Sequence, residues 1–153
     1  MIHVAYIEPV KASDAWAVLE PMLAKALTHA HGELATKDVL VMIQEHKAQM
    51  WLVLREPNVW LGCALTEIVT YPRLKSVRII ALAGKEFTSW MMLMHQTLVR
   101  FGQSEGAVRI EAFGRKGWVR MLRELGYEEA YVTVMADIGR SDSAGSIDSL
   151  EVQ

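Results

Sequence analysis

The sequence has few of the residues that cross-link or interrupt a small protein. Its 153 residues contain one cysteine, Cys63, and four prolines. A single cysteine excludes an internal disulfide, and the apolar neighbours of Cys63 predict a buried structural thiol. An excess of one charge is missing as well, because 16 basic residues are balanced by 18 acidic ones. We therefore expect no nucleic-acid partner and no attraction to an anionic membrane surface.

Long apolar runs are also missing. No run approaches the roughly 20 residues that span a bilayer, and the N-terminal stretch before Glu8 lacks the basic and apolar regions of a signal peptide. We expect no membrane partner and a cytoplasmic location. The length fits one domain with one core, predicted over residues 1–138. Residues 139–153 are rich in Ser, Asp and Gly, and are predicted to form a flexible polar tail.

The N-terminal part of the domain is predicted to contain one strand and two helices. Residues 2–7 alternate like a short strand. Ser13 or Asp14 is the expected N-cap of a helix that continues to Leu27, with Pro21 either kinking it or delaying its start. A shorter helix is expected to begin at Thr36 and to end near residue 46.

The rest of the domain is predicted to alternate strands and helices. Apolar stretches separated by turns predict an antiparallel meander of three strands, at 50–54, 59–70 and 77–83. Thr88 or Ser89 then caps a long helix, and the strand that follows it, at 107–113, implies a parallel crossover. A last helix ends at Gly126, and residues 131–135 are predicted as the final strand.

This order of elements resembles that of the GNAT acyltransferases. The segment from Leu122 to Tyr127 is similar to that family's helix ending in Leu-Gly-aromatic, and the hairpin at 51–64 is similar to its paired strands. The resemblance covers about residues 2–138. It implies an α/β fold of the α+β type with a mixed sheet, namely the GNAT acyl-CoA N-acyltransferase fold.

The resemblance also implies acetyl-CoA as the cofactor. In that family a glycine-rich loop at the start of the long helix binds the CoA pyrophosphate, because helix N-termini offer free N–H donors to phosphate. The matching stretch here, 81–89, keeps one glycine and adds Glu86, whose carboxylate would repel phosphate. The predicted cofactor-binding residues are Leu82, Gly84, Lys85, Thr88, Ser89 and Arg115.

The catalytic positions implied by the resemblance are poorly matched. The family often has a tyrosine acid where this chain has Leu122, and a glutamate base on the strand at 77–83, which here carries no carboxylate. Glu67 and His95 are the candidate catalytic groups that remain. The competing interpretations are a solvent-exposed strand carboxylate for Glu67 and a helix-rim histidine for His95.

No metal site is predicted. His29, His31 and Glu33 have a spacing that could suit a metal, but a polar connection between helices explains all three residues. Several methionines around Trp90 could form an adaptable ligand surface, although their helical spacing favours core packing.

Two functions remain open on the sequence. The first is an acetyl-CoA-dependent N-acetyltransferase with an amine substrate, in which proximity and a water-relayed base drive transfer. The second is a non-catalytic GNAT-fold structural or interaction protein with a protein partner, for example a virion component of a tailed phage, acting as an oligomer or within an assembly.

Overall fold

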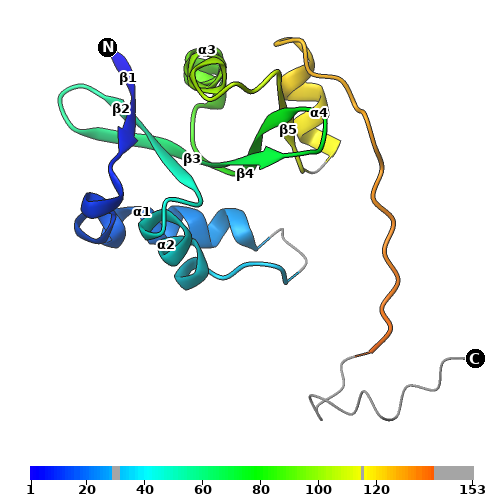
Figure 1. Cartoon of the computed structure of the whole chain (residues 1–153). Helices are drawn as coiled ribbons and strands as arrows, with labels where there is room; N and C mark the ends of the chain where they lie inside the picture. Colours follow the sequence, from blue (N-terminus) through cyan, green and yellow to red (C-terminus); the bar gives the residue numbers. More distant parts are fainter. Residues whose placement is uncertain (29–31, 115, 140–153) are drawn as a thin grey trace, which may run out of the picture.

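The computed structural model describes residues 1–28, 32–114 and 116–139, and within them five strands form one mixed sheet whose spatial order follows the chain (Figure 1). The strands are β1 (Ile2–Ile7), β2 (Gln49–Arg55), β3 (Val59–Thr70), β4 (Lys75–Gly84) and β5 (Arg109–Ala112). Neighbours from β1 to β4 pair antiparallel, whereas β5 pairs parallel to β4. The predicted meander and crossover are therefore confirmed, although β5 is shorter than the predicted strand.

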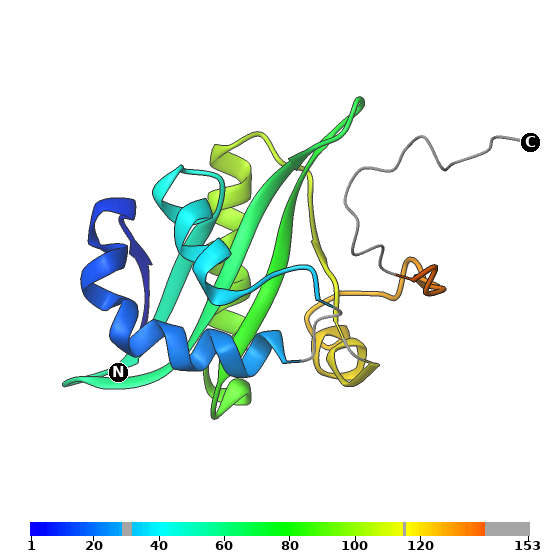
Figure 2. The same cartoon turned by 90° about the horizontal axis from the view of Figure 1, so that it is seen from below.

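Helices cover both faces of the sheet. They are η1 (Pro9–Lys11), α1 (Ala12–Leu27), α2 (Thr36–Gln44), α3 (Phe87–Ser104) and α4 (Lys116–Arg123). Helices α1 and α2 lie on one face, and α3 and α4 lie on the other (Figures 1 and 2). Within the described ranges, no helix is both long and apolar enough to cross a membrane.

The starts of α1 and α3 differ from the prediction, since α3 begins at Phe87. Neither Ser13 nor Asp14 caps α1, because the short 3-10 turn η1 leads directly into Ala12 and Lys11 already has helical dihedral angles. Pro21 lies inside α1, which continues through it to Leu27. By contrast, α2 begins at Thr36 as predicted.

Each face of the sheet has its own hydrophobic core. On the α1 and α2 face, the fully buried side chains include Leu19, Leu23 and Ile43. On the α3 and α4 face, Trp90 and Met94 pack against the sheet, so core packing is the better description of the methionines there. Exposed Met92 is an exception.

Cys63 is fully buried in the α1 and α2 core, as predicted. Burial raises the pKa of its thiol to about 12, since the thiolate is poorly solvated there. The side chain is therefore an inert packing group at neutral pH.

The prediction of a final strand at residues 131–135 is wrong. Residues 127–139 form neither helix nor strand, and the large apolar side chains between 131 and 138 are exposed. The apolar pattern was suited to a strand, but a strand needs a neighbour for its backbone groups, and no strand among the described residues pairs with this segment. Beyond Gly139 the predicted polar tail lies outside the described residues.

Candidate functional site

A bulge in β4 determines where the sheet opens. Leu65 of β3 is paired with Ala81, whereas the next residue, Thr66, is paired with Ile79, so Ile80 is the extra residue on β4. The pairing of β4 with β5 ends at the same level, with Ile79 opposite Ala112. From Ile80 to Gly84, no strand within the described residues covers the side of β4 that faces β5.

A large groove extends from this opening. Its volume is about 2380 Å³, and the residues that line it come from β3, β4, β5, all four α-helices and the segment 127–133. The β4 wall includes the residues after the bulge, up to Gly84. The groove therefore connects the splayed strands with the region before α3.

A polar cluster ties three strands together at one side of the groove. Arg78 of β4 donates to Glu67 at 3.2 Å, to Glu111 at 3.0 Å and to the Tyr71 hydroxyl at 3.1 Å. Tyr71 in turn donates to Glu111 at 2.7 Å. Although burial alone would raise it, the pKa of Glu111 is held below its ordinary value by hydrogen bonds from Tyr71 and Arg78. Glu67, the predicted base, is thus an ion-pair partner as well as a groove residue.

His95 and Tyr127 form a pair on another wall of the groove. His95 Nδ1 lies 2.9 Å from the Tyr127 hydroxyl oxygen, and the two rings meet edge to face with centroids 5.2 Å apart. Burial lowers the pKa of His95 and raises the pKa of Tyr127 to about 12. At neutral pH, the pair is therefore a neutral imidazole beside a protonated phenol.

The stability of the protein is expected to fall on acidification because of His95. Its pKa is below the ordinary 6.5 in the folded state, so the unfolded chain takes up the proton first as pH decreases below that value. The contribution of neutral His95 to the free energy of unfolding is complete above pH 6.5 and is lost as the pH falls below that value. Urea unfolding between about pH 7.5 and pH 5 should show this loss, and His95→Gln should reduce it.

Tyr127→Phe is the matched control for that experiment. It removes the hydroxyl but keeps the burial, and burial is the cause of the pKa shift. The pH dependence should therefore persist in this variant. An unchanged pH dependence in His95→Gln would assign the effect to other titratable groups.

The loop between β4 and α3 has a strained and closely packed backbone. Gly84 has a φ of +131°, and a Cβ there would lie 2.3 Å from the carbonyl oxygen of Leu61. Glu86 has a φ of 57° and is the N-cap of α3. The helix thus begins at Phe87, earlier than predicted, because the left-handed Glu86 lets the chain turn sharply out of the strand.

Glu86 is neutralised by a residue from another strand. Arg55 at the end of β2 forms a two-pronged ion pair with it, at 2.8 and 3.2 Å. The hydrogen bonds from Arg55 lower the pKa of Glu86. The carboxylate predicted to repel phosphate is therefore paired with a cation that lies 31 positions earlier in the chain.

The rest of the loop is fixed by backbone contacts. The N–H of Lys85 donates to the Leu61 carbonyl at 2.9 Å, and the Lys85 carbonyl accepts from the indole of Trp90 at 2.8 Å. Ser89 N–H donates to the carbonyl of Glu86 at 2.9 Å. The first N–H groups of α3, at Phe87 and Thr88, have no acceptor within the helix because no turn precedes them.

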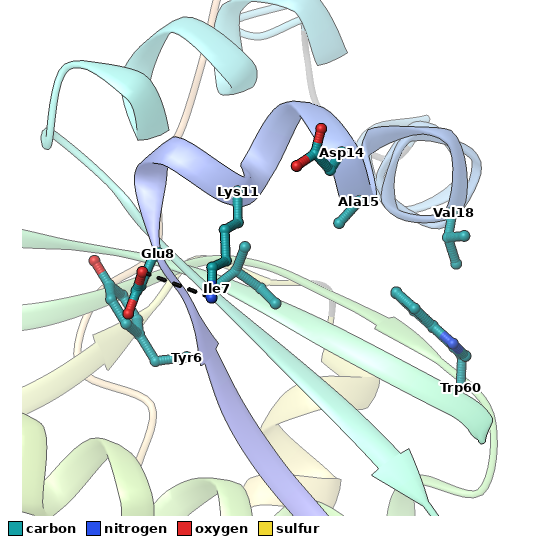
Figure 3. Close-up of a pocket in the computed structure, with 8 residues that line it drawn as sticks. All are labelled: Tyr6, Ile7, Glu8, Lys11, Asp14, Ala15, Val18 and Trp60. Carbon is teal, nitrogen blue, oxygen red and sulfur yellow. Dashed lines mark ion pairs between the residues drawn. The ribbon is translucent and has the colours of Figure 1, made fainter. Parts of the chain in front are cut away.

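A second, smaller hollow lies at the other side of the sheet, between β1, α1 and Trp60 (Figure 3). Its volume is about 480 Å³. Its one cation, Lys11, is 3.9 Å from Glu8, and Asp14 is the other charged residue that lines it. No residue predicted for a site lines this hollow.

Comparison with known proteins identifies the fold. No protein-family model matches the chain, and no curated protein matches its sequence. Solved structures do match it. A ribosomal-protein-alanine N-acetyltransferase from Brucella melitensis biovar Abortus 2308 has 10% identity and a TM-score of 0.68, with 91% of this chain and 100% of the other covered. The chain has the GNAT acetyltransferase fold.

Two further structures with the GNAT fold give the same result. Glucosamine-6-phosphate N-acetyltransferase from Arabidopsis thaliana has 10% identity and a TM-score of 0.63, covering 91% of this chain and 99% of the other. An aminoglycoside acetyltransferase from an uncultured soil metagenomic sample has 11% identity and a TM-score of 0.67, covering 91% and 99%. At these identities the likeness establishes the fold alone.

Within the GNAT fold, some predicted site residues share one groove. Glu67, His95, Leu82 and Gly84 all line it. Glu67 and His95 nevertheless contact different partners, Arg78 in one case and Tyr127 in the other. Lys85, Thr88 and Ser89 lie beside the groove at the start of α3 and do not line it.

One predicted cofactor-binding residue, Arg115, lies outside the residues that the structure describes. His29 and His31, for which no metal was predicted, also lie outside them. In residues 1–28, 32–114 and 116–139, no group of three or more His, Cys, Asp or Glu side chains is arranged to hold a metal ion.

Three residues of this candidate site were missed from the sequence. Arg55 and Arg78 act through partners on other segments, so nothing local indicated them. Tyr127 did carry a local signal, because it directly follows the helix-ending Gly126. At the position where a tyrosine was expected, Leu122 is buried in the core and only 3% exposed.

Proposed function

We propose that this chain is an acyl-CoA-dependent N-acetyltransferase of the GNAT type, which transfers an acetyl group to an amine. The observation that carries the proposal is the groove that opens at the Ile80 bulge and extends along β4 to Gly84, next to the start of α3. The GNAT fold of the whole chain supports the same function.

The residues along the groove suit acetyl-CoA. Beyond Ile79, the backbone of β4 offers N–H and C=O groups to an extended, amide-containing chain. At the end of β4, the free N–H groups of Phe87 and Thr88 suit a phosphate, and Gly84 allows close approach of the backbone. Arg55 offsets the charge of Glu86 at that end. When bound, acetyl-CoA supplies an activated acetyl thioester.

The chain's own groups can position and move protons in the groove. The carboxylate of Glu67 is held by Arg78 at the polar cluster, where it can orient a water or an amine. His95 is a second candidate, because Nε2 of a neutral imidazole can accept a proton in the tautomer whose Nδ1 carries the hydrogen of the bond to Tyr127. Tyr127 adds a protonated hydroxyl, the kind of group that Leu122 lacks. Glu67 and His95 thus remain the proposed catalytic groups.

Binding of acetyl-CoA is expected to raise the melting temperature by several degrees. A ligand at about 100 times its Kd stabilises the folded state by about 2.7 kcal/mol. Arg55→Met should weaken this binding roughly tenfold, because it leaves the Glu86 carboxylate unpaired beside the phosphate. Isothermal titration calorimetry with acetyl-CoA measures both affinities.

Two variants control this result. Arg55→Met with Glu86→Gln should regain most of the affinity, because the repelling charge is then removed. Lys11→Met removes an exposed cation on the other side of the sheet and should bind like the unaltered protein. If millimolar acetyl-CoA gives neither a thermal shift nor binding heat, the transferase proposal fails and a non-catalytic role replaces it.

A further inference from the structure

The part of the groove between β4 and the chain that follows β5 is closed at one end. We call this part, between residues 80–84 and residues 113–114, the slot. Its closed end is the last pair of the two strands, Ile79 with Ala112. A ligand that extends along β4 from the start of α3 reaches this closed end with its far terminus. The side chains at the closed end therefore determine how large that terminus can be.

The two faces of the sheet differ in polarity at the closed end of the slot. Because side chains alternate along a strand, Arg78 and Glu111 point toward the α1 and α2 face, where they form an ion pair at 3.0 Å. Ile110 and Ala112 belong to the α3 and α4 face, where Leu122 is almost fully buried. Hydrocarbon gains free energy when it is buried on the apolar face, whereas beside the ion pair it would desolvate two charges. An acyl chain longer than acetyl is thus directed toward α3 and α4.

The indole of Trp118 occupies the place where such an acyl chain would continue. Two residues after Ala112 comes Gly114, which has no side chain. A Cβ at Gly114 would lie 2.5 Å from Cε3 and 2.7 Å from Cδ2 of Trp118, so the ring covers this glycine. Trp118 also lines the groove and packs against the α3 and α4 core. The indole is therefore the bulkiest side chain beside the closed end of the slot on its apolar face.

The surroundings of Trp118 hold its indole in this position. The residue lies in the first turn of α4, which follows β5 closely in the chain and in space (Figure 1). Leu122 lies four residues later on the same side of the helix and is buried in the α3 and α4 core. The ring has the backbone of Gly114 on one side and this core on another. It cannot move aside for a ligand without losing these contacts.

We propose that Trp118 closes the slot to long acyl groups and restricts the donor to acetyl and other short acyl thioesters of CoA. The inference rests on the proposed function, because it concerns the donor that binds in the same groove. It assigns Trp118 to the acyl end of the donor and not to the CoA part. A substitution at Trp118 should therefore change the preference for acyl length and leave the affinity for CoA itself unaltered.

Isothermal titration calorimetry of the full chain with CoA, acetyl-CoA and hexanoyl-CoA tests the inference without any acceptor. The unaltered protein should bind hexanoyl-CoA about tenfold or more weakly than acetyl-CoA, because a packed site does not admit extra methylenes. Trp118→Ala should bind hexanoyl-CoA about tenfold or more tightly than the unaltered protein does, because the space left by the indole can bury roughly four further methylenes. The affinity for CoA should change by less than about twofold. Trp118→Leu should show part of the same gain.

Trp60→Ala is the matched control, because Trp60 is also a partly buried indole but lines the smaller hollow. It should keep the acyl-length preference of the unaltered protein, and circular dichroism checks that each variant is folded. Equal affinities of the unaltered protein for acetyl-CoA and hexanoyl-CoA would overturn the inference and leave the proposed function standing. Weaker binding of all three ligands by folded Trp118→Ala would assign the indole to the CoA part and would overturn it too. Absence of binding by any of the three would remove the proposed function, and this inference with it.

Discussion

Replacing Trp90 by alanine is expected to lower the free energy of unfolding by about 3–5 kcal/mol, as for other buried aromatic residues. The side chain is fully buried in the α3 and α4 core and packs against Phe87, with ring centroids 5.0 Å apart. Its indole also donates to the Lys85 carbonyl at 2.8 Å. The substitution therefore removes a core anchor and a restraint on the loop before α3. Urea unfolding measures the loss.

Trp90→Phe separates the two contributions. It keeps an aromatic ring in the core but leaves the Lys85 carbonyl without its donor, which costs about 1 kcal/mol. The rest of the alanine effect belongs to the lost ring volume. Equal losses in both variants would contradict this division, because the hydrogen bond would then account for the whole effect.

Gly84→Val should lower the free energy of unfolding by about 3 kcal/mol or more, as expected for steric strain at a special backbone position. The residue has a φ of +131°, a region that side chains with a Cβ rarely adopt. A Cβ would also lie 2.3 Å from the Leu61 carbonyl oxygen and 2.4 Å from the Cα of Gly62. Both neighbours are backbone atoms of β3, so they cannot move without disturbing the sheet. Chemical denaturation gives the magnitude.

Gly106→Ala is the matched control for the steric part. Gly106 also has a positive φ, of +78°, but a Cβ there would meet nothing within 4 Å. Only the backbone preference is lost, which costs about 1–2 kcal/mol. A loss at Gly84 no larger than the loss at Gly106 would show that β3 and β4 can separate to admit a side chain.

The order of the elements could be predicted because periodicity is a local property. The strands of the meander, α2 and the parallel crossover all follow from patterns within short windows. The start of α1 could not, since η1 precedes it and removes the need for Ser13 or Asp14 as a cap. The predicted strand at 131–135 failed for a different reason. Its residues favour a strand, but the pairing partner lies outside what a local pattern can specify.

The site was less predictable than the fold, because its contacts are long-range. The pairing of Arg55 with Glu86 joins residues 31 positions apart, and that of His95 with Tyr127 joins residues 32 apart. From the sequence, Glu86 was therefore an unbalanced charge and His95 an isolated titratable group. The bulge at Ile80 was equally hidden, since the apolar run 77–83 fits a regular central strand equally well.

The bulge also changes which layer each side chain of β4 enters. Ile79 belongs to the α3 and α4 core, whereas both Ile80 and Ala81 pack with the α1 and α2 core. Leu82 belongs to the α3 and α4 core again. Side chains of a regular strand alternate strictly between the two faces of the sheet. Because of the one extra residue, each later side chain of β4 faces the side opposite to the one it would face in a regular strand. One further residue inserted before Leu82 would exchange the faces that Leu82 and Ala83 enter, whereas deletion of Ile80 itself would restore strict alternation and keep both side chains in their present cores. Strand β4 therefore tolerates a change of residue type better than an added residue.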